Sequence, residues 1–183
     1  MKLVLIQPSE GGEPSPGLLT ERGVVSLNST VERRQTSQLT MQGVIDEFDR
    51  LRPALERLAA QGEALPLTAV RLRAPLPRPG KILCCIANYW EHAQREARPL
   101  NMFLKNPEAV IGPNDTIVLP EFTEPWIFMH EAELALVIKG PAKKVSQANW
   151  QSAVFGLYVP DRRVGARRGK TDLEGGQLAG QVV

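Results

Sequence analysis

The spacing of hydrophobic residues predicts a small mixed unit in the first part of the chain. Residues 2–7 and 18–27 hold short apolar runs bounded by glycine and proline, which is typical of antiparallel strands. From Thr40 the apolar residues recur at three- and four-residue intervals, which predicts helix. Pro53 falls inside this pattern and lacks a backbone N–H, so we expect two helices or one helix that kinks after Arg52.

Three prolines at alternate positions follow the helical part. Residues 75–80 read Pro-Leu-Pro-Arg-Pro-Gly, a composition that favours a stiff, extended segment. We therefore predict an α+β fold in which a small N-terminal α+β domain (residues 1–74) precedes a proline-rich linker (75–80). The linker is expected to keep that domain at a distance from a second domain, residues 81–183.

The second domain opens with a continuous apolar run that ends abruptly in polar residues. Residues 81–87 predict a strand buried on both faces, in which the adjacent Cys84 and Cys85 are reduced core thiols. His92 follows, and on a helix Glu96 would share its face, where a carboxylate can orient an imidazole. The two could form a general base, or they could be an ordinary surface histidine and its acidic neighbour.

Residues 130–138 carry the most distinctive polar pattern. Side chains alternate in a strand, so the even-numbered apolar residues line one face, which we expect to be core, while Glu131 and Glu133 lie on the other. Their carboxylates would lie roughly 6–7 Å apart, and like charges at that distance repel unless a cation lies between them. Mg²⁺ or Ca²⁺ takes oxygen ligands of this kind. The alternative is a solvated strand face with two surface glutamates.

Two more charged residues stand at the ends of predicted strands. A hydrophobic strand over residues 102–105 ends in Lys105, and Asp161 closely follows the apolar residues 157–159. Asp161 is therefore a third carboxylate at a strand end.

Composition argues against several kinds of partner. The net charge of +2 is too mild for a nucleic-acid or membrane surface, and the basic segment 162–170 lacks the aromatic residues that stacking on RNA needs. No run approaches the roughly 18 apolar residues of a membrane span, and the N-terminus lacks the features of a signal peptide. We expect a cytoplasmic protein without a nucleic-acid or membrane partner.

Several short motifs, taken together, resemble the fumarylacetoacetate hydrolase family in order and spacing. They are Arg78-Pro79-Gly80-Lys81-Ile82-Leu83-Cys84, Asn88-Tyr89-x-x-His92, Phe103-Leu104-Lys105, Gly112-Pro113, His130-Glu131-x-Glu133-Leu134 and Val154-Phe155-Gly156. The resemblance runs from about Arg78 to Asp161. It implies that residues 81–183 are the first part of a mixed β-roll catalytic domain.

The resemblance also implies a metal-dependent reaction. In that family a divalent cation is held by the Glu-x-Glu pair and a later aspartate, which here correspond to Glu131, Glu133 and Asp161. The cation would be Mg²⁺, or alternatively Mn²⁺ or Ca²⁺. A histidine that works with a glutamate activates water, so His92 and Glu96 are the candidates for that step.

The substrates that the resemblance implies are 2-oxo or 1,3-dicarbonyl acids, such as acylpyruvates, whose C–C bond is hydrolysed. Some relatives instead decarboxylate oxaloacetate, isomerise or hydrate similar compounds. Lys105 would hold the acidic substrate or neutralise developing charge. Asn88, Tyr89 and Arg167 are further candidates for substrate binding. A homodimer in the full-length form and a place in the breakdown of aromatic compounds are also implied.

The sequence departs from the family pattern in places. Arg95 stands where the family usually has the second member of the dyad, and Glu96 comes one residue later. Asp161 and Arg167 are out of their usual spacing. The sequence stops at Val183, before the strands that close the roll, so we expect a member truncated at its C-terminus. A truncated member without activity and a non-catalytic module with a structural Ca²⁺ site are the alternatives.

Overall fold

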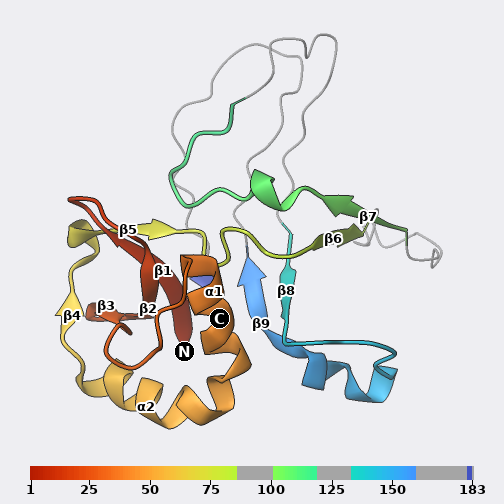
Figure 1. Ribbon diagram of the computed structural model, residues 1–183, viewed down its shortest axis with the longest axis horizontal. Helices are drawn as coiled ribbons and strands as arrows, with labels where there is room; N and C mark the ends of the chain where they lie inside the picture. The colour runs from red at the N-terminus through yellow and green to blue at the C-terminus, as the bar shows by residue number, and fades with distance from the viewer. Residues whose placement is uncertain (86–100, 119–132, 160–180, 183) are drawn as a thin grey trace.

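The computed structural model describes residues 1–85, 101–118, 133–159 and 181–182 (Figure 1). Within these ranges the chain forms a sheet with the strand order β4-β3-β2-β1-β10-β9-β8, in which β5 also pairs with β1. The N-terminal part supplies β1 (Lys2–Pro8), β2 (Ser15–Thr20), β3 (Gly23–Ser26), β4 (Ala64–Leu65) and β5 (Val70–Arg73). The mixture of helix and strand agrees with the predicted α+β class, and the sheet is curled.

Strand β1 is the centre of the sheet. It pairs with β2, β5 and β10, all antiparallel, and its pairing with β10 joins Leu3 to Val182. Leu3 and Leu5 belong to one hydrophobic cluster, whereas Val4 and Ile6 belong to a second one. Both faces of β1 are therefore buried, which explains why its sequence is a continuous apolar run and not an alternating one.

The helical pattern forms α1 (Ser37–Asp46) and α2 (Phe48–Gln61). Thr36 caps α1, because its side-chain oxygen accepts a hydrogen bond from the Leu39 N–H at 3.1 Å. Two helices were one of the predicted outcomes, but the break falls at Glu47 and not at Arg52. Pro53 lies inside α2. Because Pro53 has no backbone N–H, one carbonyl loses its hydrogen-bond donor, and that carbonyl belongs to the first turn of the helix.

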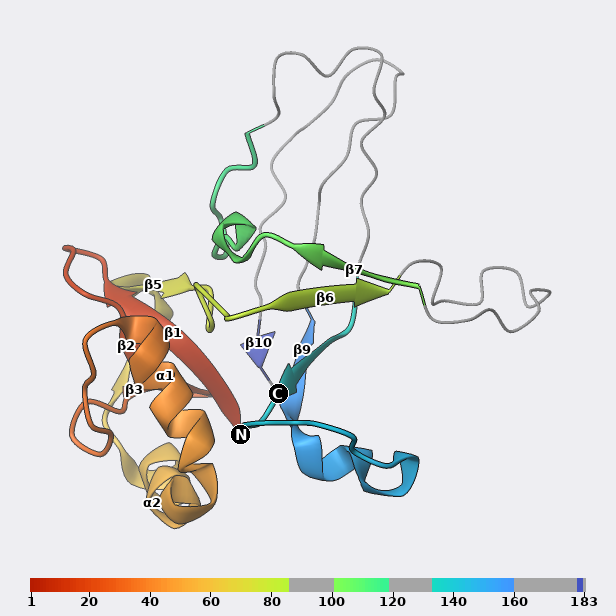
Figure 2. The same ribbon diagram turned by 45° about the vertical axis from the view of Figure 1, so that its right-hand side comes forward.

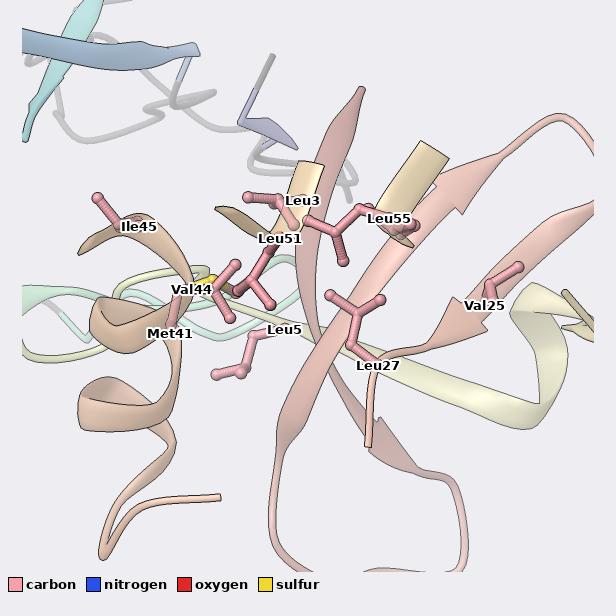
Figure 3. Packing of buried hydrophobic residues seen from close by; sticks show 10 residues of the cluster. Leu3, Leu5, Val25, Leu27, Met41, Val44, Ile45, Leu51 and Leu55 are labelled. Atoms are coloured by element: carbon pink, nitrogen blue, oxygen red, sulfur yellow. The ribbon is translucent and has the colours of Figure 1, made fainter. Parts of the chain in front are cut away.

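The main hydrophobic core lies between the sheet and the two helices (Figure 3). Strand residues point into it from one side and helix residues from the other. Its buried members are Leu3, Leu5, Leu18, Val25, Leu27, Met41, Val44, Ile45, Leu51 and Leu55.

The expectation that the proline-rich segment keeps the two parts of the chain apart is wrong. Ala74 and Pro75 are buried, and Leu76 packs against the main core. The backbone N–H of Arg78 also donates to the side-chain oxygen of Gln38 at 2.9 Å. Proline makes the segment stiff, but its apolar side chains gain more by covering the core than by remaining in water.

The rest of the described chain forms shorter elements, which Figure 2 shows from a second side. The strands are β6 (Ile82–Cys85), β7 (Met102–Lys105), β8 (Ala135–Ile138), β9 (Val154–Val159) and β10 (Gln181–Val182). The 3₁₀ helices are η1 (Leu67–Ala69), η3 (Pro107–Ala109) and η4 (Gln147–Ala153). None of the helices described is both long and apolar enough to cross a membrane.

The prediction that the strand after the linker is buried on both faces is also wrong for its described residues. In β6 Cys84 is buried, but Leu83 is 60% exposed. Strand β6 pairs with β7 in a two-stranded sheet, and no other described strand flanks it. Cys84 and Cys85 are both free thiols, as expected, although Cys85 is only half-buried.

Candidate functional site

Two of the predicted site residues come together in the structure. Lys105 is the last residue of β7, and Glu133 lies two residues before β8 begins. The Lys105 Nζ atom is 3.9 Å from the Glu133 Oε1 atom, and the two side chains are 22% and 29% exposed. Residues from distant motifs therefore meet in a partly shielded position.

The local structure explains how Lys105 reaches this position. Strand β7 pairs with β6 in a register that sets Lys105 opposite Ile82. Lys105 and Phe103 share a face of β7, and the Lys105 Nζ atom lies 5.5 Å from the centroid of the Phe103 ring. The ammonium group is thus placed between an aromatic ring and a carboxylate, both of which attract a cation.

The face of β8 that we expected to be core is exposed. Leu134, Leu136 and Ile138 are 52%, 49% and 48% exposed. The opposite set, which includes Glu133 and Val137, is half-buried, and Val137 packs against the main core. The predicted alternation is present, but the carboxylate faces the protein and the leucines face outward. Periodicity fixes which residues share a face, and the neighbouring elements decide which face is covered.

The other predicted site residues lie outside the described residues. They are Asn88, Tyr89, His92, Glu96, Glu131, Asp161 and Arg167. Glu133 itself precedes β8, so the part of the Glu-x-Glu motif that the structure describes is not in a strand.

Of the three predicted metal ligands, Glu133 is the one that lies within the described residues. Within the described ranges, no group of three or more His, Cys, Asp or Glu side chains is placed to hold a metal ion. The Glu133 carboxylate is a hard oxygen donor, partly shielded from water, which is the type that Mg²⁺ and Mn²⁺ bind. Glu133 therefore fits a divalent-cation site that the predicted partners Glu131 and Asp161 would complete.

The structure also shows polar contacts that sequence reasoning missed. Asp115 accepts hydrogen bonds from the side chain of Arg71 and from the backbone N–H of Gly112, the latter at 2.7 Å. The Arg73 guanidinium lies 3.5 Å from the same carboxylate. The Gly112 contact closes the turn that holds Asp115, and the two arginine contacts fasten this turn to β5. No local pattern signals the arginine contacts, because the partners are distant in sequence.

A second missed contact ties β8 to the helices. The Lys139 Nζ atom donates to Oδ2 of Asp49, in α2, at 2.6 Å. This hydrogen bond and the charge of Lys139 lower the pKa of the Asp49 carboxyl below its usual 3.8. At the break between α1 and α2, a hydrogen bond from Arg50 likewise lowers the pKa of Glu47.

Residues 81–167 match the family described as "Fumarylacetoacetate (FAA) hydrolase C-terminal". Fumarylacetoacetate hydrolase domain-containing protein 2 of Pongo abelii is 32% identical over 168 residues, which are 87% of this chain and 51% of that protein. A mitochondrial oxaloacetate tautomerase of Homo sapiens matches with the same identity and coverage. The chain thus spans about half the length of these curated relatives.

Solved structures agree with these matches. The maleylpyruvate hydrolase of Sphingobium sp. SYK-6, in complex with manganese(II) and pyruvate, superposes with a TM-score of 0.74 at 28% identity. The alignment covers 93% of this chain and 60% of that chain. A 5-carboxymethyl-2-hydroxymuconate delta-isomerase from Mycobacterium smegmatis gives a TM-score of 0.60 at 26% identity, with 91% and 56% covered. These likenesses confirm the resemblance seen in the motifs, and the chain belongs to the fumarylacetoacetate hydrolase family.

Proposed function

We propose that this chain is part of a metal-dependent hydrolase or lyase that cleaves a C–C bond in 2-oxo or 1,3-dicarbonyl acids of the acylpyruvate type. The observation that carries the proposal is the contact between Lys105 and Glu133. The contact places the ammonium group of Lys105, which can bind an acidic substrate, beside the carboxylate of Glu133, which can bind a metal ion. Both residues lie within the segment that matches the hydrolase family.

In this proposal Glu131, Glu133 and Asp161 hold Mg²⁺ or Mn²⁺. The manganese(II) in the similar maleylpyruvate hydrolase supports a divalent cation. When bound, the ion would polarise the keto oxygen and stabilise negative charge that develops on it. The cytoplasmic location and the homodimer remain predictions.

Lys105 binds the substrate carboxylate. Its ammonium is partly shielded from water, so its attraction for an anion is stronger than that of a fully exposed lysine. Asn88, Tyr89 and Arg167 complete the proposed substrate contacts. Because Lys105 stands close to Glu133, the substrate carboxylate would be held beside the metal-binding carboxylate.

His92, oriented by Glu96, moves the proton. For hydrolysis, the imidazole takes a proton from water as the water oxygen bonds to the carbonyl carbon. The C–C bond then breaks, and the same proton passes from the imidazolium to the departing carbon. The products are two acids, and atoms and charge balance without an oxidant or reductant.

A tautomerase is the second candidate, because relatives with 32% identity carry that name for oxaloacetate. The same base would then shift a proton between carbon and the enol oxygen, and no C–C bond would break. A decarboxylase, a further isomerase or hydratase, and a non-catalytic metal-binding module remain alternatives.

The test measures two reactions in parallel with Mn²⁺ present. Release of pyruvate from an acylpyruvate reports hydrolysis, and decay of the oxaloacetate enol absorbance reports tautomerisation. Hydrolysis that disappears in Glu133→Gln supports the first proposal. Enol decay alone supports the tautomerase, and Mn²⁺ binding with neither reaction supports the non-catalytic module.

The proton-transfer role has its own variant. His92→Ala should lower turnover at least about 100-fold, the lower end of the range for general acid–base catalysis, while Mn²⁺ affinity is unchanged. Titration calorimetry on the same sample measures the affinity. Loss of metal binding together with turnover would instead show a structural role for His92.

A further inference from the structure

The residues that flank strand β8 hold it on both sides: Glu133 lies two residues before it and Lys139 directly after it. Glu133 at one end meets Lys105 of β7, and Lys139 at the other end meets Asp49 of α2. Val137 lies between them and packs against the main core. The segment that carries the proposed metal ligand therefore contacts α2 and the main core.

The neighbouring strand contributes the largest side chain to this contact. Phe155 of β9 packs against the main core, and its ring meets the ring of Phe48 edge-to-face, with centroids 5.0 Å apart. The Arg52 guanidinium lies 5.1 Å from the centroid of the Phe48 ring, on the same helix. Aromatic pairs of this geometry stabilise a contact beyond the apolar area that they bury.

An irregularity in the pairing of β8 with β9 brings Phe155 to this position. Val137 pairs with Gly156 and Ile138 pairs with Val154, so Phe155 has no partner across the ladder. A bulge of this kind re-aims a side chain and bends its strand. Here the bulged residue is the one whose ring contacts Phe48 of α2.

We propose that the start of α2 positions β8, so that Phe48, Asp49 and Phe155 are positioning residues for Glu133. The claim rests on the proposed function only in taking Glu133 as a metal ligand. Among the described strands, β8 is at the end of its sheet and is joined to β1 only through β9 and the two-residue β10. A slip of β8 by one residue against β9 would turn Glu133 to the opposite face. The contacts with α2 provide a second reference for the register of β8, in addition to its pairing with β9.

The alternative is that these contacts contribute to stability alone. A matched control, Val24→Ala, separates a positioning role from a role in stability alone. Val24 is fully buried in the second cluster, and none of the described residues of that cluster belongs to β8 or β9. Phe48→Ala and Val24→Ala should both destabilise the protein. Only Phe48→Ala should alter β8.

Hydrogen exchange of the peptide spanning residues 133–139 is the first readout, and Mn²⁺ affinity is the second. In Phe48→Ala we expect faster exchange in that peptide and an Mn²⁺ dissociation constant raised about tenfold, equivalent to about 1.4 kcal/mol. Phe48→Leu, which keeps most of the bulk, should recover most of both. Val24→Ala should leave both at the wild-type value.

A charge exchange tests the other end of the strand and does not require a cavity in the core. Asp49→Lys and Lys139→Asp should each speed exchange in β8, and the double variant should restore slow exchange. A double variant no better than the singles would remove Asp49 from the proposal.

Equal changes in Phe48→Ala and Val24→Ala, or no change in either, overturn the inference and leave the proposed function standing. If the wild-type protein binds no Mn²⁺, the proposed function fails. The exchange comparison then decides by itself whether α2 positions β8.

Discussion

The N-terminal part of the chain and the strands β6 to β9 differ in how completely they bury their hydrophobic residues. In the first, leucines such as Leu5 and Leu55 are fully buried between the sheet and the helices. In the second, Leu83, Leu104 and Leu136 are about half exposed or more. The strands of both regions are rich in apolar residues, so among the described residues the difference lies in how many neighbouring elements each strand has.

The closed hydrophobic core and the residues of the candidate site belong to different parts of this molecule. The N-terminal unit has a closed core and no residue among the predicted site candidates. Of the proposed site, the structure describes Lys105, at the end of β7, and Glu133, just before β8. Strands β8 and β9 rest on the N-terminal unit through Val137 and Phe155. The closed region thus supports the region that carries the candidate chemistry.

The largest expected effect is a stability difference between two leucine truncations. Leu55→Ala removes a fully buried side chain and should destabilise the fold by about 2–5 kcal/mol. Leu104→Ala alters a side chain that is 66% exposed, and its effect should stay within about 0.5 kcal/mol. Urea unfolding of both variants measures the contrast. Similar losses of stability in the two variants would show that the sheet of β6 and β7 is covered in solution.

The next prediction concerns association through the exposed leucines. Leu136 and Leu157 pair across β8 and β9, and both are exposed. An uncovered apolar sheet surface promotes association, so we expect the chain to form higher oligomers or to precipitate as concentration rises. Leu136→Lys should shift sedimentation toward the monomer.

The matched control for that experiment is a lysine on a surface that is already polar. Glu56→Lys in α2 raises the net charge by two units, one more than Leu136→Lys does, without touching the strand surface, so it tests the effect of charge more strictly. If Glu56→Lys disperses the oligomers as well as Leu136→Lys does, net charge and not the leucine surface governs association.

A smaller effect separates the roles of Lys105 and Glu133. Glu133→Gln removes an anionic ligand and should weaken Mn²⁺ binding at least about tenfold. Lys105→Met removes a positive charge near the ion and should tighten Mn²⁺ binding about tenfold, from about 1.4 kcal/mol for a single and a double positive charge about 6 Å apart in water. The same variant should raise KM for an acidic substrate. Titration calorimetry and steady-state rates test the two opposite changes, and weaker Mn²⁺ binding in Lys105→Met would contradict the assignment.

The smallest expected effect is the pH dependence of the contact between the two regions. Lys139 lowers the pKa of Asp49 in the folded state below its usual 3.8, so the unfolded state binds more protons in that range. The stability that this contact adds is fully present above that value and is lost as pH falls through the folded-state pKa. Urea midpoints of wild type and Asp49→Asn should therefore differ near pH about 5 and converge near pH about 2.

Lys139→Gln should reproduce the profile of Asp49→Asn, because either change removes the same contact. Glu47→Gln is a useful comparison, since Glu47, between α1 and α2, pairs with Arg34 and Arg50, which both belong to the N-terminal part of the chain. A difference between wild type and Asp49→Asn that persists in acid would mean that the Asp49 side chain acts by something other than its charge.

The sequence by itself was sufficient for local features of this protein. Apolar runs predicted β1 and the strand that ends at Lys105, because side-chain direction in a strand depends only on local geometry. Helical spacing predicted α1 and α2, and the motifs predicted the family, since their order and spacing are properties of the sequence alone.

The tertiary structure alone decided which surfaces are covered. The period of β8 was predictable, but its covered face depends on where α2 and the main core lie. The proline-rich segment was expected to separate two domains, yet Leu76 folds onto the core. The contact between Lys105 and Glu133 joins separate strands, and β9 meets α2 through a bulged phenylalanine. Such long-range contacts depend on the packing of whole elements, and local sequence patterns carry no information about which partner an element will meet.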